Sequence, residues 1–344
     1  YNITSVALAS EDFFPQHPHT HTVHLVNVAY NSLFLGEICL PDWDMFHSKH
    51  KSGYLHAAAR AIGGCPVYVS DKPKEHDIEL LKKLVLPDGS VLRAKLPGRP
   101  TRDCLFEDVG RDQKTLLKIW NQNAVGGVVG VFHVQGVAWN FKTNENEVLL
   151  NNGESPKRLV SAVKPYDVEN FRQTNNEGSF VSFRHRTGDI EVLHTGQDET
   201  DVALDHGEWE ILTIVPIERI STDYAGSSVS WAPVGLSDML NSGGALLSSD
   251  GLERVPTESI PILLNDAPTL ITRASMTSRG PGKFVSYCRP APSHVLLDGK
   301  SYDSSKNAAE LAFLYDETNG QLSFVLPNEI GSNGSPHSIT VLWE

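Results

Sequence analysis

The sequence is poor in cysteine and has no dense group of cysteines. Its 344 residues include four, Cys39, Cys65, Cys104 and Cys288, and no two of them form a Cys-x-x-Cys pair. This spacing excludes a disulfide scaffold and favours reduced thiols, so we expect a cytoplasmic protein. Cys39 and Cys65 fall in expected strands, where a thiol packs as a small apolar side chain.

Positive charge and long apolar runs are also scarce. The 29 Lys and Arg residues are outnumbered by 42 Asp and Glu residues, which gives a net charge of -13. Nucleic-acid binding depends on clustered Lys and Arg that neutralise phosphates, so we expect no nucleic-acid partner. The longest apolar run, residues 124–134, contains glycines and is well short of the roughly 20 residues of a membrane helix. We expect no membrane partner either, and neutral or cationic ligands are the easier ones to accommodate.

Several common motifs are missing. No Gly-x-Gly-x-x-Gly follows a strand, no phosphate loop with Gly-Lys-Ser/Thr occurs and Gly-x-Ser-x-Gly is absent, so we predict no cofactor. The chain has no secretory signal pattern and no methionine before Tyr1, and we expect a piece of a longer protein. Asn2-Ile-Thr4 and Asn333-Gly-Ser335 match the glycosylation pattern, but matches this short often arise by chance.

A histidine-rich stretch runs from His17 to His24. His17, His19 and His21 would share one face of an extended segment, which would suit a metal ion. No cysteine or carboxylate is fixed among them, and a loop after Pro15 is well solvated. A polar loop near the mouth of a pocket is the favoured interpretation, and we predict no metal site.

What the sequence does contain is a short apolar stretch that runs into aspartate, three times in its first 71 residues. The stretches are 5–12, 37–44 and 66–71. Helical patterns follow each stretch, over 22–35, over 54–62 and after Asp77. Parallel strands with such connections collect their carboxyl ends on one face, where barrel enzymes place their active sites. Three units cannot close an eight-stranded barrel, so the other strands lie upstream of Tyr1 unless this is a smaller open α/β sheet.

The helix boundaries are set by particular residues. Ser52 can cap the second helix and Gly63-Gly64 ends it. Asp77 caps the third, whose apolar face is expected to hold Ile78, Leu81, Leu84 and Val85.

From about Leu116 the pattern changes to alternating strands separated by Gly, Asn, Asp and Pro. Asn319-Gly320 is typical of a hairpin turn. For this half of the chain, the pattern predicts an antiparallel β-sandwich without a long helix. The expected strands are 116–120, 128–134, 180–185, 209–215, 283–288, 311–315, 322–326 and 339–343.

The carboxylates at the strand ends are the candidate chemistry. Glu11 and Asp12 end one strand, Asp42 and Asp44 flank Trp43 on the next, and Asp71 ends the third. Glycosidases need two carboxyl groups, one to protonate the leaving oxygen and one to attack or to activate water. An indole beside them offers a rigid apolar face to a sugar ring. A single aspartate after a strand is more often a helix cap or turn former, but three consecutive units favour function.

At these residues the chain resembles the plant raffinose synthase and seed-imbibition (alkaline α-galactosidase) proteins of glycoside hydrolase family 36. The resemblance extends more loosely to the C-terminus, through Gly282-Lys-Phe and residues 322–327. The matching stretches, which are long and specific, are Ser-Glu-Asp-Phe-Phe-Pro (10–15), Ala-Tyr-Asn-Ser-Leu-Phe-Leu-Gly-Glu (29–37), Pro-Asp-Trp-Asp-Met-Phe (41–46), Ala-Ala-Arg-Ala-Ile (58–62), Pro-Val-Tyr-Val-Ser-Asp-Lys (66–72), Leu-Val-Leu-Pro-Asp-Gly-Ser (84–90), Pro-Thr-Arg-Asp-Cys-Leu-Phe (100–106) and Leu-Lys-Ile-Trp-Asn (117–121).

The resemblance implies an α/β part followed by an all-β part: the last three units of a (β/α)8 barrel over 1–112 and an antiparallel β-sandwich over 113–344. It implies a retaining enzyme for raffinose-family α-galactosides, which hydrolyses them or transfers galactose from galactinol to sucrose. The family's acid/base aspartate, in an Arg-x-x-x-Asp motif, corresponds to Asp12. Asp42 and Asp44, with Trp43, correspond to the strand that binds galactose, and Asp71 to the end of the last barrel strand.

The sequence departs from the family pattern in two places, and both bear on the activity that the resemblance implies. The motif's arginine is Leu8 here, which removes a cation that would hold a sugar hydroxyl. Such a loss typically costs about 1.5 to 3 kcal/mol, on the order of tenfold to a hundredfold in binding or rate. The family's nucleophile lies in an upstream Lys-x-Asp motif that this chain lacks. A catalytically impaired sugar-binding or structural relative is therefore the alternative to an enzyme, and we expect this chain alone to be inactive.

Overall fold

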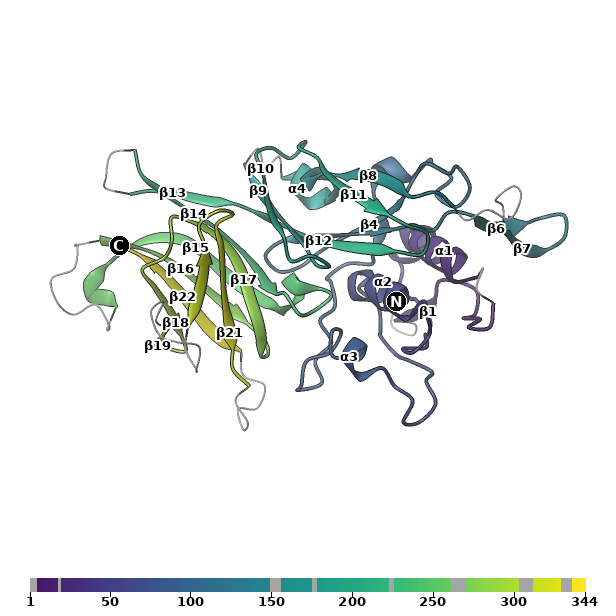
Figure 1. The fold of residues 1–344 in the computed structure, drawn as a ribbon, viewed down its shortest axis with the longest axis horizontal. Coiled ribbons are helices and arrows are strands. Elements are labelled where there is room, and N and C mark those ends of the chain that lie inside the picture. Colours follow the sequence, from purple (N-terminus) through teal and green to yellow (C-terminus); the bar gives the residue numbers. More distant parts are fainter. Residues whose placement is uncertain are drawn as a thin grey trace.

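The computed structural model describes residues 5–17, 20–148, 156–174, 178–222, 226–260, 270–302, 312–328 and 336–344. The molecule is elongated, with the N-terminal helices at one end and a β-sandwich that holds the C-terminus at the other (Figure 1). Both matches to the glycosylation pattern and His19 lie outside the described residues.

The N-terminal part begins with two of the three expected strand-to-helix units. Strands β1 (Val6–Leu8) and β2 (Leu40–Asp42) pair in parallel, with Leu8 opposite Asp42. Helices α1 (Thr20–Leu35) and α2 (Gly53–Gly63) follow them as predicted. The expected strand at 66–70 is reduced to one parallel bridge, between Phe46 and Val69. Pro66 has no N–H to contribute to a ladder, which shortens this pairing. The described residues therefore show parallel units but no closed barrel.

The helix ends follow the predicted signals in part. Gly64 ends α2 in the left-handed conformation at φ 66°, where an added Cβ would lie 2.0 Å from the carbonyl oxygen of Leu96. Ser52 stands at the N-cap of α2 but makes no side-chain cap bond. The Asp77 carboxylate accepts a hydrogen bond from the Leu80 N–H and starts α3 (Ile78–Leu81).

The predicted apolar face of α3 is right for Leu84 and for Leu81, which packs partly buried on the core, but wrong for Ile78. The structure buries Leu80 and Leu84, whereas Ile78 is 52% exposed. The cause is that α3 lasts only four residues, which is too short for helical spacing to set the buried face.

A six-stranded sheet forms the centre of the molecule. Its strand order is β10-β9-β12-β5-β4-β3, and all the neighbours pair antiparallel. Helix α2 packs on β4 and β5 so closely that a Cβ on Gly130 would lie 2.3 Å from Ile62. The strands are β3 (Arg99–Pro100), β4 (Leu117–Gln122), β5 (Gly127–Phe132), β9 (Phe180–Arg184), β10 (Ile190–Leu193) and β12 (Trp209–Pro216).

One core joins this sheet to the N-terminal helices. Trp43, Ile62, Leu117, Ile119 and Val128 belong to the same buried cluster, so the packing is continuous across residue 112. The opposite face of the sheet is covered by the pair β8 (Leu159–Val163) and β11 (Thr200–Leu204) and by α4 (Glu169–Gln173), as Figure 1 shows. A separate hairpin consists of β6 (Val137–Asn140) and β7 (Glu145–Val148).

The C-terminal part, from Glu218 onwards, is a sandwich of two five-stranded antiparallel sheets. Their strand orders are β13-β14-β17-β21-β20 and β15-β16-β22-β18-β19. The strands are β13 (Glu218–Ser221), β14 (Ser228–Leu236), β15 (Leu246–Pro256), β16 (Leu270–Ser278), β17 (Gly282–Arg289), β18 (His294–Leu297), β19 (Lys300–Tyr302), β20 (Phe313–Asp316), β21 (Gln321–Leu326) and β22 (His337–Trp343). A sandwich was predicted over 113–344, but the predicted strands at 116–120, 128–134, 180–185 and 209–215 lie in the six-stranded central sheet instead.

The predicted hairpin at Asn319-Gly320 joins β20 to β21. Gly320 has φ 75°, and the Asn319 side chain accepts a hydrogen bond from the Gln321 N–H. Between the two sheets the rings of Trp231 and Trp343 meet edge to face at 5.7 Å. Among the described helices, none is long and apolar enough to cross a lipid bilayer.

Lys118 of β4 has a buried ammonium group that forms ion pairs with two neighbouring segments. The side chain of Lys118 is 3% exposed and lies 2.6 Å from Asp103 and 3.0 Å from Asp167. It also donates a hydrogen bond to the Ala162 carbonyl oxygen at 2.7 Å.

We expect Lys118→Met to lower the free energy of unfolding by about 3 kcal/mol, because it leaves the buried Asp167 carboxylate without its cation. The matched control is Lys82→Met, which breaks an exposed pair with Glu79. That change should cost less than about 0.5 kcal/mol in denaturant unfolding. Equal losses for the two variants would contradict this account.

Candidate functional site

The predicted carboxylates gather just beyond the carboxyl ends of β1 and β2. Asp42 is the last residue of β2, and its carbonyl oxygen accepts the Ala9 N–H from the chain that leaves β1. Asp12 follows three residues after Ala9 and is exposed. The Asp44 carboxylate accepts a hydrogen bond from the Phe13 N–H at 2.8 Å, so the two strand ends are directly joined.

Asp42 is held on both sides. Its Oδ1 accepts the Asp44 N–H at 2.9 Å, and its Oδ2 accepts the Tyr68 hydroxyl at 2.8 Å. Burial, followed by the hydrogen bond to Asp42, raises the pKa of Tyr68, so this phenol stays protonated and remains a donor. The Tyr68 ring is 40% exposed beside the carboxylate. Sequence reasoning did not single out Tyr68, although it lies in the third strand-like segment, three residues before Asp71.

Trp43 does not offer a face to a ligand. Its side chain is 0% exposed and packs in the core against the end of α2, near Gly63. The expected sugar-stacking surface is therefore absent at Trp43, because its indole is buried in the core. Of the aromatic residues at these strand ends, Tyr68 is the one that combines exposure with contact to a carboxylate.

Asp71 lies in its own network. It accepts hydrogen bonds from the Ser48 N–H at 2.7 Å and the Ser48 hydroxyl at 2.6 Å, and His76 Nδ1 lies 3.1 Å away. Burial alone would raise the pKa of Asp71, but the bonds from Ser48 and His76 outweigh it and lower this pKa. The result is an ionised carboxylate that fixes the loop after Phe46.

Polar side chains of α1 fix the loop after β1. Asn27 donates to the Glu11 carboxylate at 2.7 Å, and Asn31 donates to the Ala9 carbonyl oxygen at 2.7 Å. Leu8, at the end of β1, is 45% exposed. Glu11 is thereby engaged by Asn27, whereas Asp12 projects into solvent.

Beneath the carboxylates lies Arg60 of α2, which is 0% exposed. Its Nε donates to the Asp44 carbonyl oxygen and its Nη2 to those of Trp43 and Met45. Its Nη1 reaches the carbonyl oxygen and Nδ1 of His56, both at 3.1 Å. Burial lowers the pKa of Arg60 to about 10, so the guanidinium stays charged at neutral pH.

The predicted polar histidine loop is wrong for residues 20–24. Thr20 begins α1, and His21 and His24 are each 2% exposed. The reason is the Phe13 ring, which packs against the rings of His21, His24, His47 and His56 at 5.2 to 6.4 Å. Among the described residues no group of His, Cys, Asp or Glu side chains has the geometry of a metal site.

The hydrogen bonds set the protonation of these histidines. Arg60 can only donate, so His56 Nδ1 accepts and His56 Nε2–H donates to His21 Nδ1, 2.7 Å away. His24 Nε2–H donates to the Trp43 carbonyl oxygen at 2.9 Å. Burial, and then the charge of Arg60, lowers the pKa of His24 to about 4 and lowers that of His56 well below its usual value. Burial, followed by the charge of His50, lowers the pKa of His21 to about 4.

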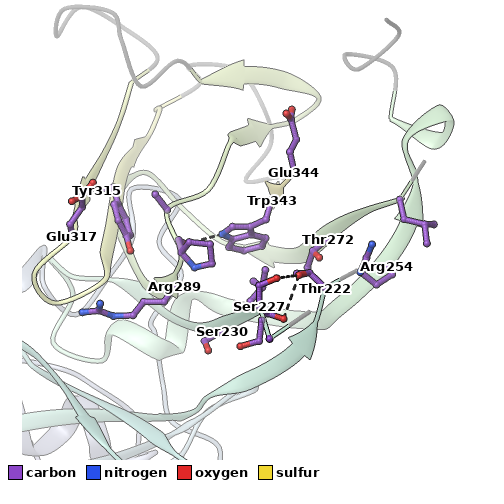
Figure 2. A pocket seen from close by; sticks show the side chains of 16 residues that line it. Thr222, Ser227, Ser230, Arg254, Thr272, Arg289, Tyr315, Glu317, Trp343 and Glu344 are labelled. Carbon is purple, nitrogen blue, oxygen red and sulfur yellow. Dashed lines mark hydrogen bonds between the residues drawn. The ribbon is translucent and has the colours of Figure 1, made fainter. Parts of the chain in front are cut away.

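A large cavity of 1210 Å³ lies elsewhere, at the end of the sandwich (Figure 2). Both sheets contribute to its lining, which includes Arg289, Tyr315 and Trp343. The Trp343 indole N–H is already bonded to the Pro290 carbonyl oxygen at 3.0 Å. None of the predicted site residues lines this cavity. It lies at the opposite end of the molecule from β1 in Figure 1, so the candidate site is the set of carboxylates at the strand ends.

Barrel enzymes place their active sites at the carboxyl ends of parallel strands, and glycosidases act with pairs of carboxyl groups. The chain belongs to the family described as raffinose synthase or seed imbibition protein Sip1, which matches residues 1–326. The family resemblance drawn from the sequence is thus confirmed.

Several curated plant proteins are similar to this chain. It is 40% identical over 342 residues to a probable galactinol–sucrose galactosyltransferase 6 of Arabidopsis thaliana, covering 98% of this chain and 41% of that protein. It is 49% identical over 249 residues to a probable galactinol–sucrose galactosyltransferase 1 of the same plant, covering 71% and 32%. It is 30% identical over 312 residues to a stachyose synthase of Pisum sativum, covering 87% and 34%. The chain therefore spans about a third to two fifths of the length of these relatives.

The buried histidines predict a specific pH dependence. The folded state lowers the pKa of His24 from 6.5 to about 4, so the unfolded state binds more protons between these values. The contribution of His24 to the free energy of unfolding is therefore complete above about pH 6.5 and decreases as the pH falls towards 4. A shift of this size corresponds to roughly 3 kcal/mol from His24 alone.

We expect the free energy of unfolding, measured with denaturant, to be lower at pH 4.5 than at pH 7. The difference between the two pH values should be smaller in His24→Gln. Glutamine keeps a donor for the Trp43 carbonyl oxygen but does not titrate. A variant whose stability falls as much as that of the parent chain would show that His24 is not the group responsible.

Proposed function

We propose that this chain is the carboxyl-terminal part of a retaining enzyme that acts on raffinose-family α-galactosides. It would move a galactosyl group from galactinol to sucrose or, by hydrolysis, to water. Support comes from membership of the raffinose synthase family and from the names of the similar proteins, which include galactinol–sucrose galactosyltransferases and a stachyose synthase. Which acceptor is used depends on contacts around the acceptor site.

The observation that carries the proposal is the contrast between Asp12 and its neighbours. Asp12 is exposed in the segment that follows β1, while Asp42 and Asp44 are held in place by hydrogen bonds, one of them from the N–H of Phe13 next to Asp12. A group that exchanges protons with a substrate must be accessible, and groups that orient a sugar must be fixed. Asp12 would give its proton to the glycosidic oxygen as the bond to galactose breaks, and then take a proton from the incoming hydroxyl or water.

The remaining residues would bind galactose. Asp42 has lone pairs left after its bonds from Asp44 and Tyr68 and would accept sugar hydroxyls. The exposed Tyr68 ring would pack on the apolar face of the sugar and so take the role that the sequence suggests for Trp43. Asp71 would shape the rim through Ser48. The attacking carboxylate would come from a Lys-x-Asp segment outside this chain.

We also propose the finer architecture that the family resemblance implies. Residues 1–112 would be the last three units of a (β/α)8 barrel and residues 113–344 the following β-sandwich domain. The open edge of β1, with Val6 and Leu8 partly exposed, would then receive the preceding strand. The enzyme would be cytoplasmic, would use sugars as its only partners and would need no cofactor.

The alternative is a catalytically impaired sugar-binding relative, and Leu8 is the observation that favours it. Leu8 stands opposite Asp42 in the β1–β2 register, where an arginine could reach both the carboxylate and a sugar hydroxyl. Calorimetry with galactose, raffinose and galactinol beside a long-incubation assay separates the two functions. Saturable binding without any product would favour the alternative.

We expect Asp12→Asn, made in the full-length protein that carries this chain, to reduce transfer from galactinol to sucrose by about 10² to 10⁴. The cause is the loss of the proton donor for the glycosidic oxygen. Asp88→Asn is the matched control, because Asp88 lies in an exposed turn where it bonds to Ser90. Unchanged turnover in the Asp12 variant would exclude its role as acid/base.

We expect Leu8→Arg to raise kcat/KM on galactosides, by on the order of tenfold to a hundredfold, because it adds a charged hydrogen bond to the bound sugar. Steady-state kinetics of the two full-length proteins measures this. A variant no faster than the parent protein would show that Leu8 is not what limits the reaction.

A further inference from the structure

Asp44 has a backbone conformation that few residues adopt. Its φ is 58°, in the left-handed region that side chains with a Cβ disfavour, although aspartate tolerates it better than most. The residue is 8% exposed and directly follows the fully buried Trp43. Such a conformation persists only where the surroundings enforce it, and it often marks a functional site.

Arg60 is the group that enforces it. Its guanidinium donates to three consecutive carbonyl oxygens, those of Trp43, Asp44 and Met45. In an extended strand successive carbonyls point in opposite directions, so a single side chain can reach all three only if the chain turns at residue 44. The other two N–H groups of Arg60 are taken by His56. All five donors are therefore used, and the turn is held from inside the core.

The turn aims the Asp44 carboxylate back at β1. Its Oδ2 accepts the Phe13 N–H at 2.8 Å and its Oδ1 accepts the Met45 N–H at 2.7 Å. The Phe13 nitrogen belongs to the peptide group that follows Asp12. The Phe13 ring is anchored among four histidine rings, and its side chain is 6% exposed. The backbone of Asp12 is thus fixed on its carboxyl-terminal side while its own carboxyl group stays exposed.

We propose that Asp44 is a positioning residue for Asp12, and that Arg60 holds Asp44 in the conformation this requires. The inference rests on the proposed acid/base role of Asp12. It gives Asp44 a role in addition to sugar binding, because its carboxylate accepts the N–H of Phe13, the residue after Asp12. Arg60 then acts on the reaction through two intermediaries, the 43–45 turn and the Phe13 peptide.

The test uses the leaving-group dependence of the full-length protein. A dinitrophenolate leaves without a proton, whereas phenol and the sugar alcohol of galactinol leave only when protonated. A misplaced Asp12 therefore slows the poor leaving groups selectively. We expect Asp44→Asn to lower kcat/KM for phenyl galactoside and galactinol by about tenfold to a hundredfold. For dinitrophenyl galactoside, kcat/KM reports only the first step, which needs no proton, and should stay within about twofold.

Asp44→Gly separates positioning from folding. Glycine prefers the φ that residue 44 adopts, so this variant relieves the backbone cost and should fold while it loses the carboxylate. We expect it to show the same selective loss as Asp44→Asn. A purely structural role for Asp44 predicts instead that the glycine variant keeps full activity on every substrate.

A double variant tests whether Asp44 acts through Asp12. If it does, adding Asp44→Asn to Asp12→Asn should slow galactinol no further than Asp12→Asn alone, since the group being positioned is already gone. Multiplied losses would overturn the proposal. Lys118→Met is the control for general destabilisation, because it weakens the fold far from the site and should not change the ratio between substrates.

The outcomes distinguish this inference from the proposed function. If Asp12→Asn itself shows no selectivity between leaving groups, the acid/base assignment fails and the role of Asp44 fails with it. If Asp12→Asn is selective but both Asp44 variants slow all substrates equally, the acid/base assignment stands and the positioning role is overturned.

Discussion

The buried guanidinium of Arg60 is the interaction on which the candidate site depends. Desolvating a charge is costly unless every donor finds an acceptor, and here five N–H groups meet four carbonyl oxygens and one imidazole nitrogen. The Phe46 ring adds a cation–π contact, with its centroid 5.2 Å from the guanidinium carbon. Because α2 also packs on the central sheet, Arg60 links the turn after β2 to the body of the molecule.

The same charge determines the chemistry of its surroundings. Burial, and then this charge, lowers the pKa of His24 and of His56, and the neutral rings can pack on Phe13 as apolar surfaces do. The tautomer of His56 follows from the direction in which Arg60 donates, and that of His24 from its bond to the Trp43 carbonyl oxygen. The site therefore consists of a rigid inner layer, formed by Arg60, Trp43 and the histidines, and an outer layer of carboxylates. Asp12 of the outer layer is exposed, whereas Trp43 of the inner layer is fully buried.

Much of the fold could be predicted from local signals. The α1 and α2 boundaries follow from helical spacing and from Gly64, and the sandwich strands follow from alternation and turn residues. Strands such as β8, β11 and β16 were not predicted, because polar residues interrupt the alternation of apolar side chains. These strands become recognisable only through their pairing with neighbouring strands. The third strand-like segment and part of the face of α3 were mispredicted because both elements are too short for a period to apply.

The candidate carboxylates could be predicted from the sequence, but their surroundings could not. Asp12, Asp42 and Asp44 were found because strand ends of parallel units converge, a property of topology that spacing reveals. Trp43 is buried and Tyr68 is exposed because of the path that the chain takes after β2. No local sequence pattern encodes this path. Arg60 carries no local signal either, because it reads as one basic residue in an alanine-rich helix. Its role depends on acceptors 15 to 17 residues away in the chain.

The most direct test of this account is amide hydrogen exchange at Phe13 in Arg60→Lys. Lysine keeps the charge but loses the planar fork that reaches three carbonyl oxygens, so the 43–45 turn should loosen and release the Phe13 N–H from Asp44. The account predicts that exchange at Phe13 becomes at least about tenfold faster, while exchange at Ile119 in the central sheet stays as in the parent chain. Unchanged protection at Phe13 would contradict the claim that Arg60 holds the site together.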